Sequence, residues 1–85
     1  TMWFVYIIKC RDGTLYTGIT TDVQRRIEEH NESEKGAKYT RGKRPVTLAY
    51  HKQCTDRSAA AKEEHRIKQL TREEKQMLIS KMDTE

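Results

Sequence analysis

The segment that decides the fold is residues 3–20, which read WFVYIIKCRDGTLYTGIT. Its first half is dense in β-branched and aromatic residues, and a second short run of the same kind follows the triplet Arg11-Asp12-Gly13. This pattern predicts two antiparallel strands, over 3–10 and 14–19, joined by a tight turn. The resulting hairpin is the start of a small sheet.

The turn decides which side chains of the hairpin share a face. A two-residue turn at Asp12-Gly13 places Tyr6 and Tyr16 on opposite faces, because side chains alternate along a strand. A three-residue loop, with Gly13 in the left-handed position of a bulge, pairs Tyr6 with Gly18 and puts both tyrosines on one face. The triplet Arg-Asp-Gly favours the second register, although the residues permit both.

Length and composition bound what the chain can be. Its 85 residues suffice for a single domain over 1–85, with an ordered core expected at about 3–80. Charged residues make up 35%, and the only long apolar run, residues 2–8, is too short to span a bilayer, which argues against a membrane protein. Residues 1–10 lack the pattern of a secretory signal, so we expect a cytoplasmic location. Cys10 and Cys54 lack metal-ligand spacing and are expected to be reduced thiols.

Three helices and a third strand are expected after the hairpin. Thr21 and Gln24 have the spacing of a capping box at the start of the first helix, and Thr71 and Glu74 repeat that spacing before the last one. The expected elements are a helix to residue 30 or 31, a strand at 46–50, a helix from 55–58 to 70 and a short third helix after Thr71. The order ββαβαα indicates an α+β domain whose small sheet is flanked by helices.

The first helix has two basic residues on the side that faces the core. Val23 and Ile27 form its apolar stripe, and helical periodicity adds Arg26 and His30 to that side, while Arg25 points away. An arginine at the edge of a core, such as Arg26, often only forms a structural ion pair. A histidine near a helix C-terminus often only caps the helix. A buried guanidinium nevertheless requires a partner, because burial of an unpaired charge is costly. The inward face of this helix is therefore a candidate functional surface.

A basic segment follows this helix. Residues 32–45 contain two glycines and a proline without apolar periodicity, so we expect a long surface loop. The net charge of +4 permits a nucleic-acid partner without requiring one. The loop residues expected to contact nucleic acid are Lys38, Tyr39, Arg41, Lys43 and Arg44.

The second expected helix carries two adjacent carboxylates. Glu63 projects toward the middle of the apolar stripe formed with Ile67 and Leu70, and Glu64 projects toward its margin. Either glutamate alone is typical of a surface helix that pairs its acids with neighbouring bases. Helical periodicity therefore does not choose between them.

In combination, these residues resemble the GIY-YIG nuclease superfamily, and in particular its short stand-alone bacterial (UPF0213-like) members. The resemblance covers residues 4–79 and includes Val5-Tyr6-Ile7, Tyr16-Thr17-Gly18, Arg26, His30-Asn31 and Glu64. The first motif reads Val-Tyr-Ile and the second Tyr-Thr-Gly, so both keep the tyrosine and the second keeps its glycine.

The resemblance implies a three-stranded antiparallel sheet and a divalent-metal-dependent endonuclease that hydrolyses phosphodiester bonds in DNA, with a structure-directed or repair-related role. It also selects Glu64 over Glu63 as the ligand of one Mg²⁺ or Mn²⁺ ion, places Thr20 near the nucleic acid, and suggests a protein partner that supplies specificity. The catalytic residues that it implies are Tyr6, Tyr16, Arg26, His30 and Glu64.

Physical roles for these residues agree with the resemblance. Arg26 has the planar fork that binds a phosphate, Tyr16 is the candidate general base, and Tyr6 and His30 would orient it or relay its proton. Gly18, opposite Tyr6 in the favoured register, is expected to leave an open surface for a phosphate.

Two other functions use the same residues differently. A nucleic-acid-binding module without catalysis would need the basic loop but not the Tyr16, Arg26 and Glu64 combination. A scaffold would instead bind a protein partner through exposed apolar residues of the last helix, at Met77, Leu78 and Ile79.

Overall fold

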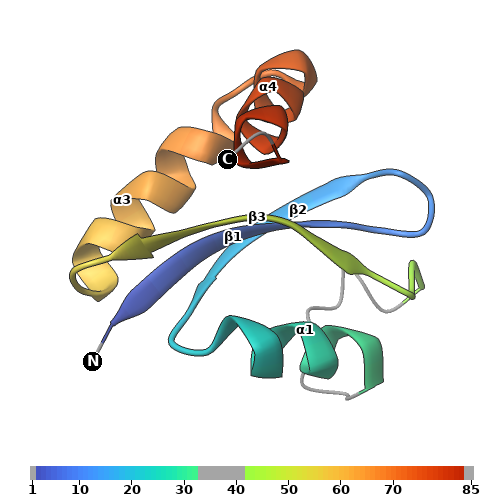
Figure 1. The fold of residues 1–85 in the computed structure, drawn as a ribbon, viewed down its shortest axis with the longest axis horizontal. Coiled ribbons are helices and arrows are strands. Elements are labelled where there is room, and N and C mark those ends of the chain that lie inside the picture. The colour runs from blue at the N-terminus through green and yellow to red at the C-terminus, as the bar shows by residue number, and fades with distance from the viewer. Residues whose placement is uncertain (1, 33–41, 84–85) are drawn as a thin grey trace.

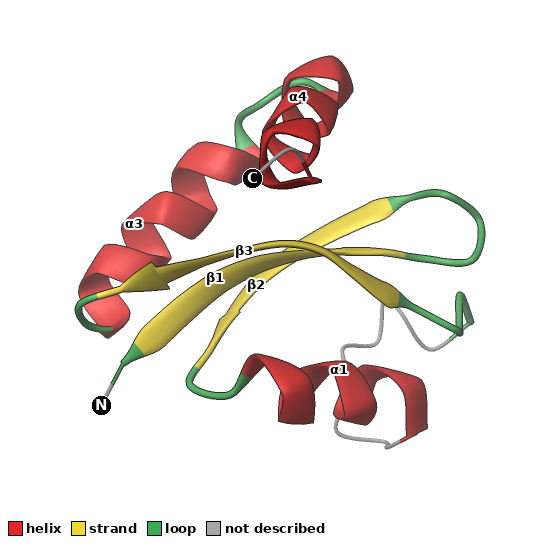
Figure 2. Ribbon diagram, viewed as in Figure 1, coloured by secondary structure: helices red, strands yellow, loops and turns green. Residues whose placement is uncertain are grey.

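A computed structural model describes residues 2–32 and 42–83, which form three strands and three helices (Figure 1). The strands are β1 (Trp3–Lys9), β2 (Leu15–Thr20) and β3 (Thr47–Cys54), and the helices are α1 (Val23–Glu32), α3 (Arg57–Lys68) and α4 (Arg72–Asp83). The sheet is antiparallel with the order β2-β1-β3. Helix α1 covers one face, and α3 and α4 lie over the other (Figure 2). The expected α+β fold and its ββαβαα order are confirmed.

The hairpin has the three-residue loop. Gly13 has φ +87°, the Gly13 N–H donates to the Cys10 carbonyl at 2.9 Å, and the Cys10 N–H donates to the Thr14 carbonyl at 2.8 Å. Tyr6 consequently lies opposite Gly18. The left-handed conformation required of one loop residue explains why glycine occupies position 13.

Strand β3 is longer than the sequence predicted. The expected strand ended at residue 50, whereas β3 continues through the exposed residues His51, Lys52 and Gln53 to Cys54. Its pairing with β1 runs as far as Trp3 opposite Cys54, with a bulge near the middle. An edge strand keeps polar side chains in water, so a search for apolar residues ends too early.

The cap of α1 also differs from the prediction. Asp22, not Thr21, caps the helix, because its Oδ1 accepts the Arg25 N–H at 3.0 Å. Gln24 donates to Glu28 of the next turn at 3.5 Å instead of reaching back to the cap. Thr20 fixes this start by accepting the Asp22 N–H at 3.2 Å.

The two later helices start at side-chain caps. Asp56 accepts the Ala59 N–H at 2.8 Å and α3 begins at Arg57. The capping box before α4 is confirmed, since the Thr71 N–H donates to Glu74 at 2.9 Å and the Glu74 N–H donates to the Thr71 hydroxyl at 3.2 Å. Helix α4 runs to Asp83, so the expectation of a short last helix was wrong.

Alternation along β1 supplies a core on each face of the sheet. The buried residues on the α1 side are Tyr6, Ile8, Cys10 and Val46, with Tyr16 and Ile27 packed against them. The buried residues on the other side are Val5, Ile7 and Ile67. Cys10 and Cys54 are free thiols, as expected. No helix in the described part of the chain is long and apolar enough to cross a bilayer.

Candidate nuclease site

Two tyrosines and a histidine meet on the α1 face of the sheet. The Tyr6 hydroxyl lies 3.0 Å from His30 Nε2, and both groups are buried. The rings of Tyr6 and Tyr16 each stand edge-on to the imidazole, with centroids 6.0 Å and 5.5 Å from it. The hairpin register and the inward face of α1 thus bring three of the predicted site residues together.

Gly18 has a different role from the one predicted. A Cβ at this position would lie 2.5 Å from the Tyr6 oxygen and 2.8 Å from the ring carbon that bears it. The phenol therefore occupies the space above Gly18, and the expected open surface for a phosphate is absent there. Glycine is needed at position 18 because the aromatic ring crosses the neighbouring strand against its backbone.

Arg26 adds a positive charge to this cluster. It interacts with Tyr6 through a side-chain hydrogen bond, and its Nη1 donates to Glu29 at 3.1 Å. Burial lowers the pKa of Arg26, but its bonds to Tyr6 and Glu29 outweigh this effect and raise it, so the guanidinium stays charged. The neighbouring Arg25 side chain is 59% exposed against 24% for Arg26, as the periodicity predicted.

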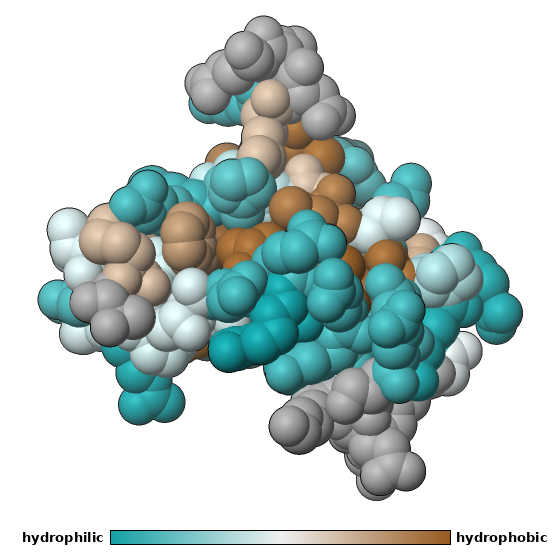
Figure 3. All heavy atoms as spheres, turned by 60° about the horizontal axis from the view of Figure 1, so that its bottom comes forward, coloured by the Kyte–Doolittle hydropathy of each residue, from teal (hydrophilic) through white to brown (hydrophobic). Residues whose placement is uncertain are grey.

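The outer side of α1 is hydrophilic, as Figure 3 shows from the α1 side of the sheet. Polar side chains gather there over a band of hydrophobic atoms. Most residues of α1 are polar, and His30 is the only residue of the helix that is fully buried.

His30 is neutral at physiological pH. Burial and then the charge of Arg26 lower its pKa to about 4, against which Glu29 acts only weakly. A neutral imidazole has one nitrogen that donates and one that accepts, so His30 Nε2 can either accept the Tyr6 proton or donate to the Tyr6 oxygen. This pair is therefore suited to orienting a phenol.

Tyr6 keeps its proton. Burial raises its pKa, and the hydrogen bond and charge of Arg26 oppose the rise without cancelling it. The charge of Tyr16 raises it further, and so does the charge of Glu64, which belongs to α3. The fifth predicted catalytic residue thus shares one electrostatic environment with Tyr6.

The structure distinguishes the two glutamates that periodicity left equivalent. Both oxygens of Glu63 are used, by Lys52 of β3 at 3.0 Å and by Arg66 of its own helix. Glu64 makes a single ion pair, with Lys68 at 3.6 Å, and its side chain is 25% exposed. Glu64 is therefore the carboxylate that can exchange its partner for a cation.

The described residues fit a cation that takes few protein ligands. No group of three or more His, Cys, Asp or Glu side chains among residues 2–32 and 42–83 is placed to hold an ion. A metal at Glu64 would therefore complete its shell with water and substrate oxygens, which Mg²⁺ does readily. A carboxylate oxygen is a ligand type that hard divalent cations bind.

Most of the chain is similar in sequence to known proteins. Residues 2–77 match the family described as the GIY-YIG catalytic domain. The chain belongs to the GIY-YIG nuclease family. It is 61% identical over 77 residues to the UPF0213 protein DP2720 of Desulfotalea psychrophila, a match that spans 91% of this chain and 70% of that protein.

Further relatives share the UPF0213 name. The UPF0213 protein VNG_2274C of Halobacterium salinarum is 56% identical over 78 residues, which cover 92% of this chain and all of that protein (100%). The solution structure of the UPF0213 protein BH0048 of Bacillus halodurans is 45% identical with a TM-score of 0.60, covering 94% of this chain and 84% of that one. The E. faecalis protein EF2693 is 37% identical with a TM-score of 0.66, covering 100% and 90%.

Of the predicted nucleic-acid contacts in this GIY-YIG domain, Lys38, Tyr39 and Arg41 lie outside the described residues. Lys43 pairs with Asp12 at 3.5 Å, beside the hairpin loop. Arg44 donates through Nε to the His30 carbonyl at 2.5 Å. The side chains of Lys43 and Arg44 thus make contacts within the fold and are also partly exposed.

Thr20 is buried, and its hydroxyl is part of the turn that starts α1. No role was predicted for Asn31, whose side chain donates to the Val46 carbonyl at 3.0 Å and accepts the Val46 N–H at 2.6 Å. These bonds tie the end of α1 to the start of β3. The sequence signal that could have indicated this role is the position of Asn31 directly after His30, at the end of the expected helix.

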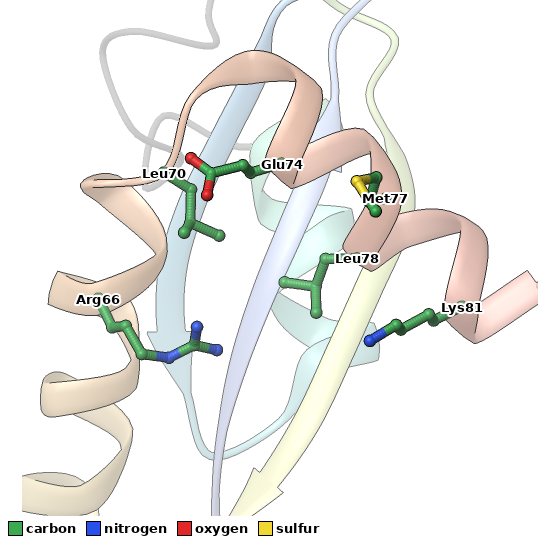
Figure 4. Close-up of a pocket in the computed structure, with 6 residues that line it drawn as sticks. All are labelled: Arg66, Leu70, Glu74, Met77, Leu78 and Lys81. Atoms are coloured by element: carbon green, nitrogen blue, oxygen red, sulfur yellow. The ribbon is translucent and has the colours of Figure 1, made fainter.

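The last helix has less exposed apolar surface than the scaffold interpretation requires. Leu78 and Ile79 pack against the core under α3 and α4, and of the three residues only Met77, at 65%, is largely exposed. Met77 borders a pocket between α3 and α4 whose other lining residues include Leu70 and the charged Arg66 (Figure 4). Leu78 and Ile79 therefore serve to hold α4 on the sheet.

Proposed function

We propose that this chain hydrolyses phosphodiester bonds in DNA with the help of one divalent cation at Glu64. The observation that carries the proposal is the convergence of a protonated Tyr6, a neutral His30 and a charged Arg26 on one face, within the field of Glu64. In-line hydrolysis needs a group for the phosphoryl charge, a base for water and assistance to the leaving oxygen. The site has a candidate for each role.

Arg26 is the phosphate-binding group. Its fork-shaped guanidinium matches two phosphoryl oxygens, which a lysine ammonium does not. Glu29 holds the guanidinium at 3.1 Å, while 24% of the Arg26 side chain remains accessible to a substrate. A fixed cation at this position stabilises the negative charge that develops on the phosphoryl oxygens.

The two tyrosines have different roles. The raised pKa of Tyr6 keeps its proton in place, so Tyr6 donates or is held by His30 and does not act as a base. Tyr16 is only half-buried and stands edge-on to the same imidazole, so Tyr16, in its phenolate form, is the candidate that accepts a proton from the attacking water and becomes a phenol. His30 orients this pair because its burial keeps it neutral.

Glu64 would hold the cation. When bound, the cation would neutralise phosphoryl charge and assist departure of the leaving oxygen. The chain itself provides a carboxylate whose one ion pair, to Lys68, is exposed and weak. Release of Lys68 therefore costs little.

The substrate assignment rests on charge and family. The net charge of +4, Arg44 on the His30 carbonyl and Lys43 at the hairpin loop suit a polyanionic strand. We assign DNA as the substrate, with structure-directed or repair-related cleavage, a protein partner that adds specificity, and a cytoplasmic location. Lys38, Tyr39 and Arg41 are proposed to extend the contact with the strand.

The test is a cleavage assay with matched glutamate variants. Labelled linear, single-stranded and branched DNAs and an RNA are incubated with Mg²⁺ or Mn²⁺ and with wild type, Glu64→Gln or Glu63→Gln. Metal-dependent products that disappear with Glu64→Gln and survive Glu63→Gln are expected. Binding without cleavage by wild type would instead identify a nucleic-acid-binding module, and loss of cleavage with both variants would remove the special role of Glu64.

A further inference from the structure

Arg57 is held by an aromatic ring and not by an ion pair. Four of the charged residues of α3 form ion pairs, namely Glu63, Glu64, Arg66 and Lys68, whereas Arg57 and Lys62 have none within residues 2–32 and 42–83. The guanidinium carbon of Arg57 lies 5.8 Å from the centroid of the Trp3 ring. The only neighbouring acid in sequence, Asp56, has a carboxylate oxygen that caps the helix through the Ala59 N–H.

The aromatic ring fixes this cation without using its donors. A guanidinium over an indole is attracted by the ring's π-electrons, so its N–H groups remain available for an oxygen ligand. Trp3 is itself held by β1, opposite Cys54 of β3. Arg57 is therefore an exposed but positioned cation, which loses less side-chain entropy on binding than a free surface lysine does.

Arg57 and Glu64 line one pocket. The other lining residues are Ile19 of β2 and the small residues Ser58 and Ala61 of α3. Helical periodicity places residues 57, 61 and 64 on the same face of α3, and the small side chains leave the surface between Arg57 and Glu64 open. This pocket adjoins the proposed metal site, because Glu64 is one of its lining residues.

The spacing suits successive groups of one nucleic-acid strand. Seven residues separate Arg57 from Glu64, which is roughly 10 Å along a helix axis. About three nucleotides of one B-DNA strand span that length. A strand whose scissile phosphate lies at Glu64 and Arg26 would thus bring a neighbouring phosphate to Arg57.

We infer that Arg57, positioned by Trp3, is a second phosphate-binding residue that holds the substrate strand a few nucleotides from the scissile phosphate. This inference rests on the proposed function, since it assumes that a nucleic-acid strand lies at Glu64. It assigns Arg57 to strand positioning, so the residue acts on binding and not on the chemical step.

The test measures binding without cleavage. A fluorescein-labelled double-stranded DNA oligonucleotide is titrated in EDTA with wild type, Arg57→Ala, Arg57→Lys and Lys62→Ala, over a range of KCl concentrations. Lys62→Ala is the matched control, because it removes one exposed positive charge from the opposite side of the same helix. Trp3 is the chain's only tryptophan, so its fluorescence in a parallel titration with unlabelled oligonucleotide reports on this pocket directly.

Arg57→Ala is expected to weaken binding about tenfold and to lower the slope of log K against log salt by about one. Arg57→Lys is expected to lie between wild type and Arg57→Ala, and Lys62→Ala to change affinity by less than about twofold. Wild-type Trp3 fluorescence should change on titration.

Equal effects of Arg57→Ala and Lys62→Ala, an unchanged Trp3 signal, or no binding by wild type would overturn the inference. Because the readout is binding in EDTA, a chain that fails to cleave DNA can still pass this test. A chain that cleaves can also fail it, so the two proposals are distinguishable.

Discussion

The two faces of the sheet differ in the polar side chains that they bury. Under α3 and α4, the buried residues Val5, Ile7 and Ile67 are aliphatic, and their burial stabilises the fold without polar partners. Under α1, the buried Tyr6 and His30 satisfy each other by a hydrogen bond and lie beside a charged guanidinium. The first face thus contributes mainly to stability, whereas the second bears the cost of buried polar groups, which we propose serve catalysis.

The largest expected effect is loss of stability on the aliphatic face. Ile67 is fully buried, so Ile67→Ala should lower the free energy of unfolding by about 2–5 kcal/mol through lost burial and a cavity. Urea denaturation measures this change. Met77→Ala, at a 65% exposed position of α4, is the control and should change it by less than about 0.5 kcal/mol. Equal effects would mean that this face does not dominate stability.

On the α1 face, the contact of Gly18 with Tyr6 predicts a coupled effect. Gly18→Ala should cost about 1–3 kcal/mol and displace the phenol from His30, because the added methyl has no room. The double variant Tyr6→Ala/Gly18→Ala should lose less than the sum of the two single variants. Strict additivity in urea denaturation would show that the close approach has no energetic meaning.

The buried imidazole predicts a pH dependence. The pKa of His30 falls from an ordinary 6.5 to about 4 on folding, so the unfolded chain binds more protons between these values. This contribution to stability is present above pH 6.5 and is lost as the pH falls toward 4. Urea denaturation at several pH values should show a flatter profile for His30→Gln than for wild type. Parallel profiles would contradict a neutral His30.

The smallest effect concerns the start of the helix that carries the site. Asp22→Ala should destabilise the fold by about 1 kcal/mol, since it removes the acceptor of the Arg25 N–H. Thr21→Ala should be nearly silent. Thermal denaturation of both variants measures the two effects. A larger loss of stability with Thr21→Ala than with Asp22→Ala would show that Thr21 caps the helix, as the sequence suggested.

Local chemistry was predictable from the sequence, and long-range pairing was not. Gly13 made the favoured hairpin register possible, and from that register Tyr6 and Tyr16 were correctly placed on one face. The capping box at Thr71 was also correct, whereas at α1 the neighbouring Asp22 took the place predicted for Thr21. In contrast, the full length of β3 depends on its pairing with β1.

Side-chain competition also lay beyond the sequence. Helical periodicity does not choose between Glu63 and Glu64, because it does not contain the ion pair of Glu63 with Lys52 of β3. The role of Gly18 likewise depends on where the Tyr6 ring points, which the strand pattern does not contain. Both features combine residues from elements that are distant in sequence.

The central claim, that the α1 face serves chemistry, is tested most directly by two neighbouring arginines that share Glu29 as a partner. Arg26→Lys keeps the charge and removes the planar fork, and Arg25→Lys does the same at the more exposed position. Cleavage rate and free energy of unfolding are measured for both. We predict that Arg26→Lys slows cleavage about a hundredfold while stability changes by less than about 1 kcal/mol, and that Arg25→Lys alters neither. Cleavage by Arg26→Lys at the rate of Arg25→Lys, or a loss explained by unfolding, would contradict the account.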